Sequence, residues 1–134
     1  MPISVFLAHR KDTDDNTIDQ WCMEVAEAAR AKALNVQVHS GRDVFHQFAK
    51  MKGGFSRWGT WIARGGDAVQ RFNNIVVPDL ILGRATADIV REALRVGTSV
   101  TYWDPDTKEF ASVADVTTID DQNWKNGWRL ELSN

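Results

Sequence analysis

The spacing of apolar residues over the first part of the chain predicts a strand, a helix and a second strand. Residues 3–8 are apolar and rich in strand-forming types, which is typical of a buried central strand. From residue 17 to residue 34, apolar side chains recur at helical spacing, and Thr17 and Gln20 match a capping box at the helix start. Residues 36–38 alternate like a second short strand. Such a unit predicts two parallel strands joined by a right-handed crossover.

The segment from residue 42 to residue 72 carries a weaker pattern. Apolar residues between 44 and 51 predict a short helix, and glycine pairs occur at residues 53–54 and 65–66. Two glycine pairs so close together imply either mobility or a close approach of the backbone to another group. The segment is therefore either a surface excursion or a lid over a ligand, and the residues leave both interpretations open.

The stretch from residue 74 to residue 104 is the most informative part of the chain. A β-rich run at residues 75–77 leads into a polar loop. A short amphipathic helix follows, with Thr86 as its expected N-cap and Gly97 as its expected C-terminal glycine. Residues 99–103 then form another strand. This strand–loop–helix–strand unit predicts a parallel sheet with a ligand site at the strand ends.

Turn signals and alternation indicate that the last part of the chain extends the sheet in the antiparallel sense. A turn at residues 104–107 precedes a return strand at 110–116, and a turn at 125–127 precedes an edge strand at 128–132. Together the elements predict an α/β fold. We expect a three-layer, Rossmann-like (flavodoxin-like) domain whose mostly parallel sheet has the order 2-1-3-4, followed by an antiparallel C-terminal extension. The whole chain, residues 1–134, is expected to form a single domain.

Composition and charge are those of an ordinary globular protein. The chain is 43% hydrophobic and 25% charged, and its net charge of −2 does not indicate a basic surface for duplex nucleic acid. Cys22 is the only cysteine, which excludes an intrachain disulfide and a cysteine metal cage, and we expect it to be a buried packing thiol. No apolar run approaches the roughly 20 residues of a membrane helix, and the N-terminus lacks signal-peptide features. We expect a cytoplasmic protein without membrane contact.

Polar and charged side chains gather where the predicted parallel strands end. Because the carboxyl ends of parallel strands meet at one edge of a sheet, cations from separate strands are expected to meet there, beside a helix N-terminus. Such a site suits a phosphate-bearing or sugar-bearing ligand, and its carboxylates could hold ribose hydroxyls or act in catalysis. The candidate residues at these strand ends are His9, Arg10, Arg42, Asp79, Gly83, Arg84, Thr86 and Asp88.

Each candidate also has a structural interpretation. Asp88 in a first helical turn is favoured by the helix macrodipole alone, Arg10 can be a solvated loop charge, and His9 can be a hydrogen-bonded structural histidine. His39 and His46 lack the spacing and the third ligand of a metal site. No metal site and no cofactor are therefore expected.

The chain has six tryptophans, which is unusual for 134 residues. Aromatic faces can stack on a nucleobase, and they also fill cores and subunit interfaces. Trp58 and Trp61 lie in the glycine-flanked middle segment and are the better candidates for stacking on a ligand. For Trp124 and Trp128 we expect packing or a contact in a homodimer.

Three stretches of the chain carry a resemblance to a known family. They are VFLAHRKD at residues 5–12, NNIVVPDLILG at residues 73–83 and GRATADIVREALRVGTSV at residues 83–100. In these stretches the layout resembles the nucleoside 2-deoxyribosyltransferase-like superfamily, whose members include small deoxynucleoside-monophosphate N-glycosidases. The resemblance covers about residues 3–104 and implies a nucleoside or nucleotide ligand.

The resemblance also implies roles for individual residues. In that family a glutamate in the helix-opening motif attacks the anomeric carbon of the sugar, and a second acid positions the base and the nucleophile. Carried over to this chain, Asp88 would be the nucleophile and Asp79 the assisting acid. Arg10, Arg84 and Thr86 would contact the anion and the sugar.

This chain departs from the family pattern at the nucleophile. The acid is Asp rather than Glu, and the position of the family's glutamate, counted back from Gly97, falls on Ala87. One residue on a helix corresponds to about 100° of rotation. Of three hypotheses, the direction of Asp88 therefore separates the first two, and a cleft with no cation and no exposed ring would favour the third. The three hypotheses are an enzyme that cleaves or transfers at an N-glycosidic bond, a non-catalytic module that binds a nucleotide signal, and a protein-interaction domain.

Overall fold

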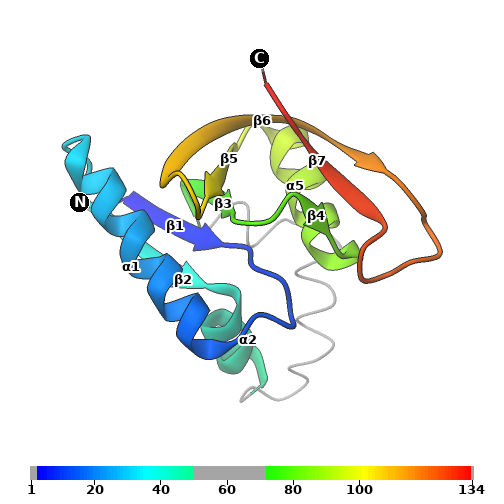
Figure 1. Ribbon diagram of the computed structural model, residues 1–134, viewed down its shortest axis with the longest axis horizontal. Coiled ribbons are helices and arrows are strands. Elements are labelled where there is room, and N and C mark those ends of the chain that lie inside the picture. The colour runs from blue at the N-terminus through cyan, green and yellow to red at the C-terminus, as the bar shows by residue number, and fades with distance from the viewer. Residues whose placement is uncertain (1–2, 50–71, 134) are drawn as a thin grey trace.

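A computed structural model of the protein describes residues 3–49 and 72–133. These residues form an α/β structure in which a seven-stranded mixed sheet packs against three helices (Figure 1). The glycine pairs of the middle segment, and with them Trp58 and Trp61, lie outside the described residues. Within the described parts of the chain, no helix is both long enough and apolar enough to cross a bilayer.

The sheet has the order β2-β1-β3-β5-β6-β7-β4. Its first four strands are parallel, which confirms the predicted order of the parallel part, and the following strands pair antiparallel. The strands are β1 (Ile3–Leu7), β2 (Val36–Ser40), β3 (Asn74–Val77), β4 (Ile81–Leu82), β5 (Ser99–Asp104), β6 (Glu109–Thr118) and β7 (Trp128–Leu132). The helices are α1 (Asp15–Ala31), α2 (Gly41–Ala49) and α5 (Arg84–Val96).

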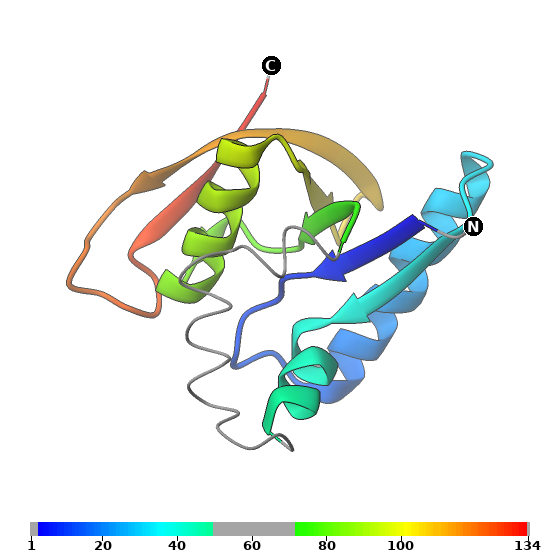
Figure 2. The same ribbon diagram turned by 180° about the vertical axis from the view of Figure 1, so that it is seen from behind.

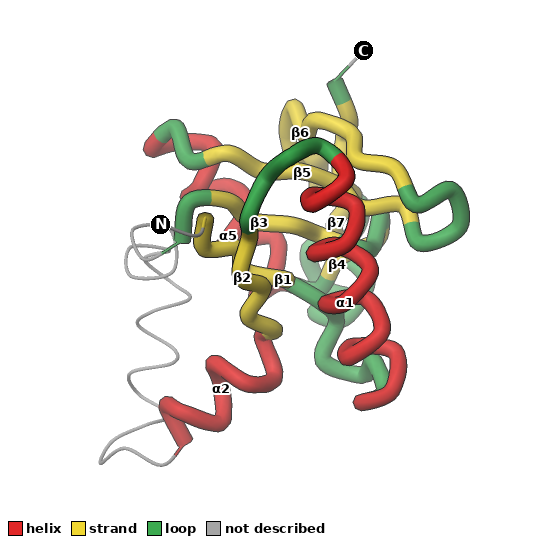
Figure 3. The backbone as a smooth tube through the Cα atoms, turned by 90° about the vertical axis from the view of Figure 1, so that its left-hand side faces the viewer, coloured by secondary structure: helices red, strands yellow, loops and turns green. Residues whose placement is uncertain are grey.

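Helices cover both faces of the parallel strands because the strand side chains alternate between two apolar cores. Val5 and Leu7 of β1 belong to the core that packs against α1, whereas Phe6 lies in the core that α5 completes. The two helices accordingly lie on opposite sides of the strands, with α1 in front in Figure 1 and α5 in front when the molecule is seen from behind (Figure 2). The side view separates the same layers (Figure 3). This arrangement directs the carboxyl ends of β1 and β3 toward one edge of the sheet.

The start of α1 differs from the predicted capping box. The N-cap is Asp14, whose carboxylate accepts hydrogen bonds from the N–H of Thr17 at 3.1 Å and from its hydroxyl at 2.7 Å. Gln20 donates to Glu24 instead of reaching back to the helix start. The prediction of Thr17 as the cap was wrong because Asp14 offers a carboxylate acceptor three residues earlier, where the helix macrodipole also favours it.

Helix α5 also begins earlier than predicted. It starts at Arg84, and its N-cap is Gly83, which has no side chain to cap the helix. Thr86 therefore lies inside the first turn, and its prediction as the N-cap was wrong. At the other end, Gly97 is the C-cap in the left-handed conformation, with φ of 83°, as expected.

The C-terminal extension closes onto α5. Strand β7 pairs with β6 on one side and with the two residues of β4 on the other, so the expected edge strand at residues 128–132 is covered at its start. The loop that joins β6 to β7, residues 119–127 (the β6–β7 loop), turns back over the start of α5 (Figure 1). Gly127 closes this loop, because its carbonyl accepts the N–H groups of Ile119 and Asp120 at 2.7 and 3.0 Å.

We expect Gly127→Ala to lower the free energy of unfolding by about 3 kcal/mol. The added Cβ would lie 2.0 Å from the carbonyl oxygen of Asp120 and 2.4 Å from that of Asn123. Urea unfolding followed by tryptophan fluorescence measures the loss. Gly97→Ala is the control: no other group lies within 4 Å, so only the left-handed backbone opposes the change, at about 1 kcal/mol. Equal losses in the two variants would show that the β6–β7 loop relaxes around the methyl group.

Candidate functional site

A cavity of about 800 Å³ lies at the N-terminus of α5. It is bounded by the loop after β1, by the first turn of α5 and by the β6–β7 loop. This volume is in the range of small-molecule sites, and the cavity occupies the predicted edge of the sheet. Its lining residues are Arg10, Lys11, Asp12, Gly83, Arg84, Ala85, Thr86, Asp88, Trp124 and Lys125.

Asp88 faces this cavity, whereas the neighbouring Ala87 is completely buried in the core. The Oδ2 atom of Asp88 lies 3.4 Å from Nε of Arg84, one helical turn earlier. The side chain of Asp88 is 29% exposed, so solvent and small molecules reach it. The register of α5 therefore presents the carboxylate, and not position 87, to the cavity.

The first turn of α5 offers backbone donors to the cavity. The N–H of Arg84 donates to the carbonyl of Trp124 at 2.9 Å, and the N–H of Ala87 donates to Gly83 at 3.0 Å. Within the described residues, the N–H groups of Ala85 and Thr86 have no acceptor, as expected for a helix start without a side-chain cap. With the positive end of the helix macrodipole, these donors form an electropositive site suited to an anion.

Arg84 lies against two tryptophan rings. Its guanidinium carbon is 5.1 Å from the ring centroid of Trp124 and 5.7 Å from that of Trp128. Trp128 is buried in the core, which confirms the packing expected of it. Trp124 is 66% exposed and lines the cavity, so it does not pack in the core, and the alternative expectation, a contact in a homodimer, stays a prediction.

Arg10 supports the cavity from the loop after β1. Its guanidinium donates to the carboxylate of Asp12, to the carbonyl of Ile81 at 3.1 Å and to the side-chain oxygen of Asn126. Each terminal nitrogen carries two N–H groups and uses one of them in these bonds. Arg10 is thus a structural residue that also keeps donors available at the cavity wall.

Asp79 is held at the end of β3 beside Arg10 and is not among the residues that line the cavity. Its carboxylate accepts a hydrogen bond from the backbone N–H of Arg10, but its Oδ2 atom is buried without a partner among the described residues. Burial raises the pKa of Asp79 above its ordinary value, and this outweighs the lowering by Arg10. A half-buried acid of this kind destabilises the fold and is a candidate functional group.

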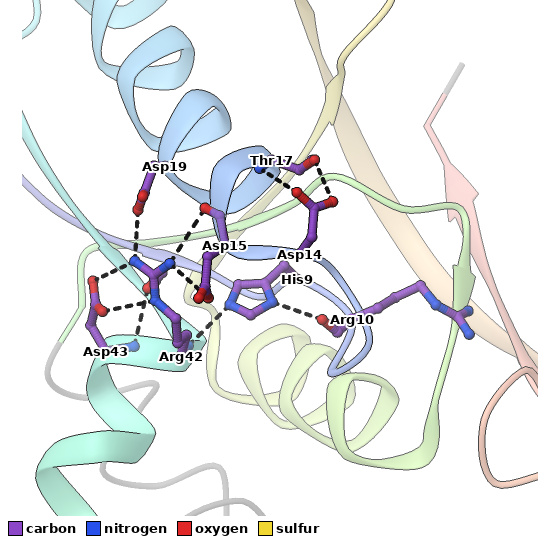
Figure 4. A network of polar contacts seen from close by, with 9 residues as sticks. His9, Arg10, Asp14, Asp15, Thr17, Asp19, Arg42 and Asp43 are labelled. Atoms are coloured by element: carbon purple, nitrogen blue, oxygen red, sulfur yellow. Dashed lines mark hydrogen bonds and ion pairs between the residues drawn. The ribbon is translucent and has the colours of Figure 1, made fainter.

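His9 and Arg42 lie away from the cavity, in a separate polar network (Figure 4). Because a carbonyl only accepts, Nδ1 of His9 donates to the carbonyl of Arg10 at 2.8 Å, and Nε2 accepts the N–H of Arg42 at 3.0 Å. This pattern fixes the neutral Nδ1–H tautomer, and burial lowers the pKa of His9. The guanidinium of Arg42 is engaged by three carboxylates, those of Asp15, Asp19 and Asp43.

The structure thus brings together five of the ten sequence-based site residues and adds others. Arg10, Gly83, Arg84, Thr86 and Asp88 line the cavity, whereas His9 and Arg42 join α2 to the end of β1. Lys11, Asp12, Trp124 and Lys125 were not among the candidates. The turn at residues 125–127 was recognised in the sequence, but no local pattern shows that it folds back onto α5.

Comparison of the chain with models of protein families, with curated proteins and with solved structures gives no match. Among the described residues, no group of three or more His, Cys, Asp or Glu side chains is placed to hold a metal ion.

We expect Asp79→Asn to raise the free energy of unfolding at neutral pH by about 1 kcal/mol, because it removes a buried charge with an unpartnered oxygen. The folded-state pKa of Asp79 is raised above 3.8. The wild-type protein therefore loses stability relative to the variant as the pH rises through that folded-state pKa, and the difference vanishes in acid. Urea unfolding from about pH 4 to pH 8 measures it. The exposed Asp121→Asn is the control, and an Asp79→Asn variant less stable at neutral pH would contradict the assignment.

Proposed function

We propose that the cavity at the start of α5 binds a nucleoside 5′-phosphate and that Asp88 acts on its N-glycosidic bond. The observation that carries the proposal is the placement of a carboxylate, a guanidinium and free backbone N–H groups in the wall of one cavity. A phosphate requires the donors and the positive charge, a sugar requires acceptors for its hydroxyls, and a glycosidic carbon requires a nucleophile within reach.

The phosphate end of the proposed site is the first turn of α5. Among the described residues, the N–H groups of Ala85 and Thr86 have no acceptor, and Arg84, the first residue of the helix, lines the same cavity. Lys11 and Lys125 add positive charge from the two loops that border the cavity. Charge-assisted hydrogen bonds of this type position a phosphate and leave the sugar directed at the next turn of the helix.

The sugar end is Asp88, one turn into α5. In the proposed reaction an Asp88 oxygen attacks the anomeric carbon, and the bond from that carbon to the base nitrogen breaks. The base leaves with the bonding electrons and takes up a proton, and water then hydrolyses the glycosyl ester to release the sugar phosphate and restore the carboxylate. Arg84 orients the Asp88 carboxylate through their 3.4 Å ion pair. The resemblance assigns the role of assisting acid to Asp79, which lies beside Arg10 after β3, just outside the residues that line the cavity.

The fold supports the same proposal. Four parallel strands in the order β2-β1-β3-β5, with helices on both faces and the cavity at the strand carboxyl ends, are consistent with a Rossmann-like (flavodoxin-like) domain. We further propose that the chain is related to the nucleoside 2-deoxyribosyltransferase-like superfamily, with its nucleophile moved by one position along α5.

A non-catalytic nucleotide-binding module is the second candidate function. Two observations favour this module. The carboxylate of Asp88 is paired with Arg84, which makes it a weaker nucleophile, and the expected assisting acid, Asp79, does not line the cavity. Both candidates share the ligand and differ only in what happens to it. The interaction-domain hypothesis called for a cleft without a cation and without an exposed ring, and this cavity has both.

We expect Asp88→Asn to reduce release of free base by at least about a thousandfold while nucleotide binding remains measurable. The amide keeps the size of the side chain and removes the nucleophilic oxygen charge. Liquid chromatography of incubations with a panel of nucleosides and nucleoside monophosphates measures the base. Asp121→Asn, which changes an exposed carboxylate of the β6–β7 loop outside the cavity lining, is the control and should retain activity. Unchanged base release in Asp88→Asn would remove Asp88 as the nucleophile.

We expect Arg84→Ala to weaken binding of a nucleoside monophosphate about tenfold and to change binding of the unphosphorylated nucleoside much less. Arg84 lines the same cavity as Ala85 and Thr86, whose N–H groups are the proposed phosphate donors. Isothermal titration calorimetry with both ligands measures the difference. Arg91→Ala on the same helix is the control, since Arg91 donates to Thr118 and does not line the cavity. Equal losses for both ligands would exclude a phosphate contact.

A further inference from the structure

Trp124 has a large aromatic side chain that is exposed to solvent. It is 66% exposed, although a tryptophan ring normally contributes most when it is buried. Trp128, four residues later, shows the usual outcome, because its ring is 2% exposed and lies in the core. An exposed ring that also lines a cavity is a common feature of binding sites for flat ligands.

Hydrogen bonds fix the backbone on both sides of Trp124. Its carbonyl accepts the N–H of Arg84 at 2.9 Å, which attaches the residue directly to the start of α5. The side-chain oxygen of Asn123 accepts the N–H groups of Lys125 and Asn126 at 3.2 and 3.1 Å, and the N–H of Asn123 donates to Asp120 at 3.0 Å. The ring is therefore presented by an ordered turn and loses little freedom when a ligand binds.

Among the described residues, the guanidinium of Arg84 is the group that lies over the indole of Trp124. The Arg84 guanidinium lies 5.1 Å from its ring centroid, and the same guanidinium pairs with Asp88. With two thirds of the side chain exposed, ring surface remains open beside the cavity. An aromatic ring can interact favourably with a cation over one face and stack on a nucleobase with the other face.

We propose that Trp124 is the base-stacking residue of this site and determines its preference for nucleotides over sugar phosphates. This inference rests on the function proposed above and adds the residue that recognises the base. Stacking uses the face of the base and tolerates every base, so Trp124 selects for the presence of a base and not for its identity. The phosphate at Ala85 and Thr86 and the base at Trp124 would then flank a sugar placed at Asp88.

The test measures binding of AMP, dAMP, CMP and ribose 5-phosphate to the wild-type protein and to variants by isothermal titration calorimetry. Trp124→Ala should weaken binding of the three nucleotides about tenfold or more. It should leave ribose 5-phosphate binding unchanged, which shows that Arg84 and the start of α5 are intact. Trp124→Phe, which keeps a flat ring, should restore most of the nucleotide affinity. Ile119→Ala in the same loop is the matched control, because Ile119 is 56% exposed and lies outside the cavity.

Four results would overturn the inference. Nucleotide affinity that is unchanged in Trp124→Ala removes the stacking role and leaves the proposed function standing. An equal loss for nucleotides and ribose 5-phosphate assigns Trp124 to supporting Arg84 and not to binding a base. A change of oligomeric state in size-exclusion chromatography without a change of nucleotide affinity makes the ring a subunit contact. If the wild-type protein binds none of the four ligands, the proposed function fails together with this inference.

Discussion

The cavity depends on the guanidinium of Arg10, which joins three parts of the chain that are far apart in sequence. It bonds Asp12 after β1, the carbonyl of Ile81 in β4 and Asn126 in the β6–β7 loop. Arg10 follows a parallel strand, whereas β4 and the β6–β7 loop belong to the antiparallel part of the sheet. These bonds therefore hold both parts around one space, and a planar side chain with donors in several directions is suited to this task.

The same loop completes the start of α5. The carbonyl of Trp124 accepts the N–H of Arg84, whereas the N–H groups of Ala85 and Thr86, two residues of the cavity wall, have no acceptor in the described part of the chain. A side-chain cap would have used one of these donors, and Gly83 provides none. The Oδ2 atom of Asp79, which is buried without a partner among the described residues, is a second feature that lowers stability. Polar groups that lower the stability of the fold are typical of a binding site, and two of them lie at this edge of the sheet. The polar atoms of His9 and Arg42, by contrast, are hydrogen-bonded and stabilise the loops that they join.

Much of the parallel half of the fold could be predicted from the sequence, because buried strands and an amphipathic helix leave local patterns at residues 3–8 and 75–77. The capping of α1 was misassigned because Asp14 and Thr17 are both good caps by type, and only the backbone decides between them. The pairing of β4 with β7 carries no local signal, since two residues are too few to show a period. Trp124 was not predicted as a cavity residue because its exposure depends on long-range contacts. The turn that carries it is held by Arg10 and Arg84, and the spacing of residues in the sequence does not show these contacts.

The central claim is that the first turn of α5 is the anion end of a nucleotide site. Amide NMR spectra of the ¹⁵N-labelled protein, recorded during titration with dAMP and with inorganic phosphate as the reference anion, test it most directly. The account predicts that the amides of Ala85 and Thr86 shift most in both titrations and that the Trp124 indole N–H shifts with dAMP alone. Shifts confined to other elements, or no shifts at Ala85 and Thr86, would contradict it.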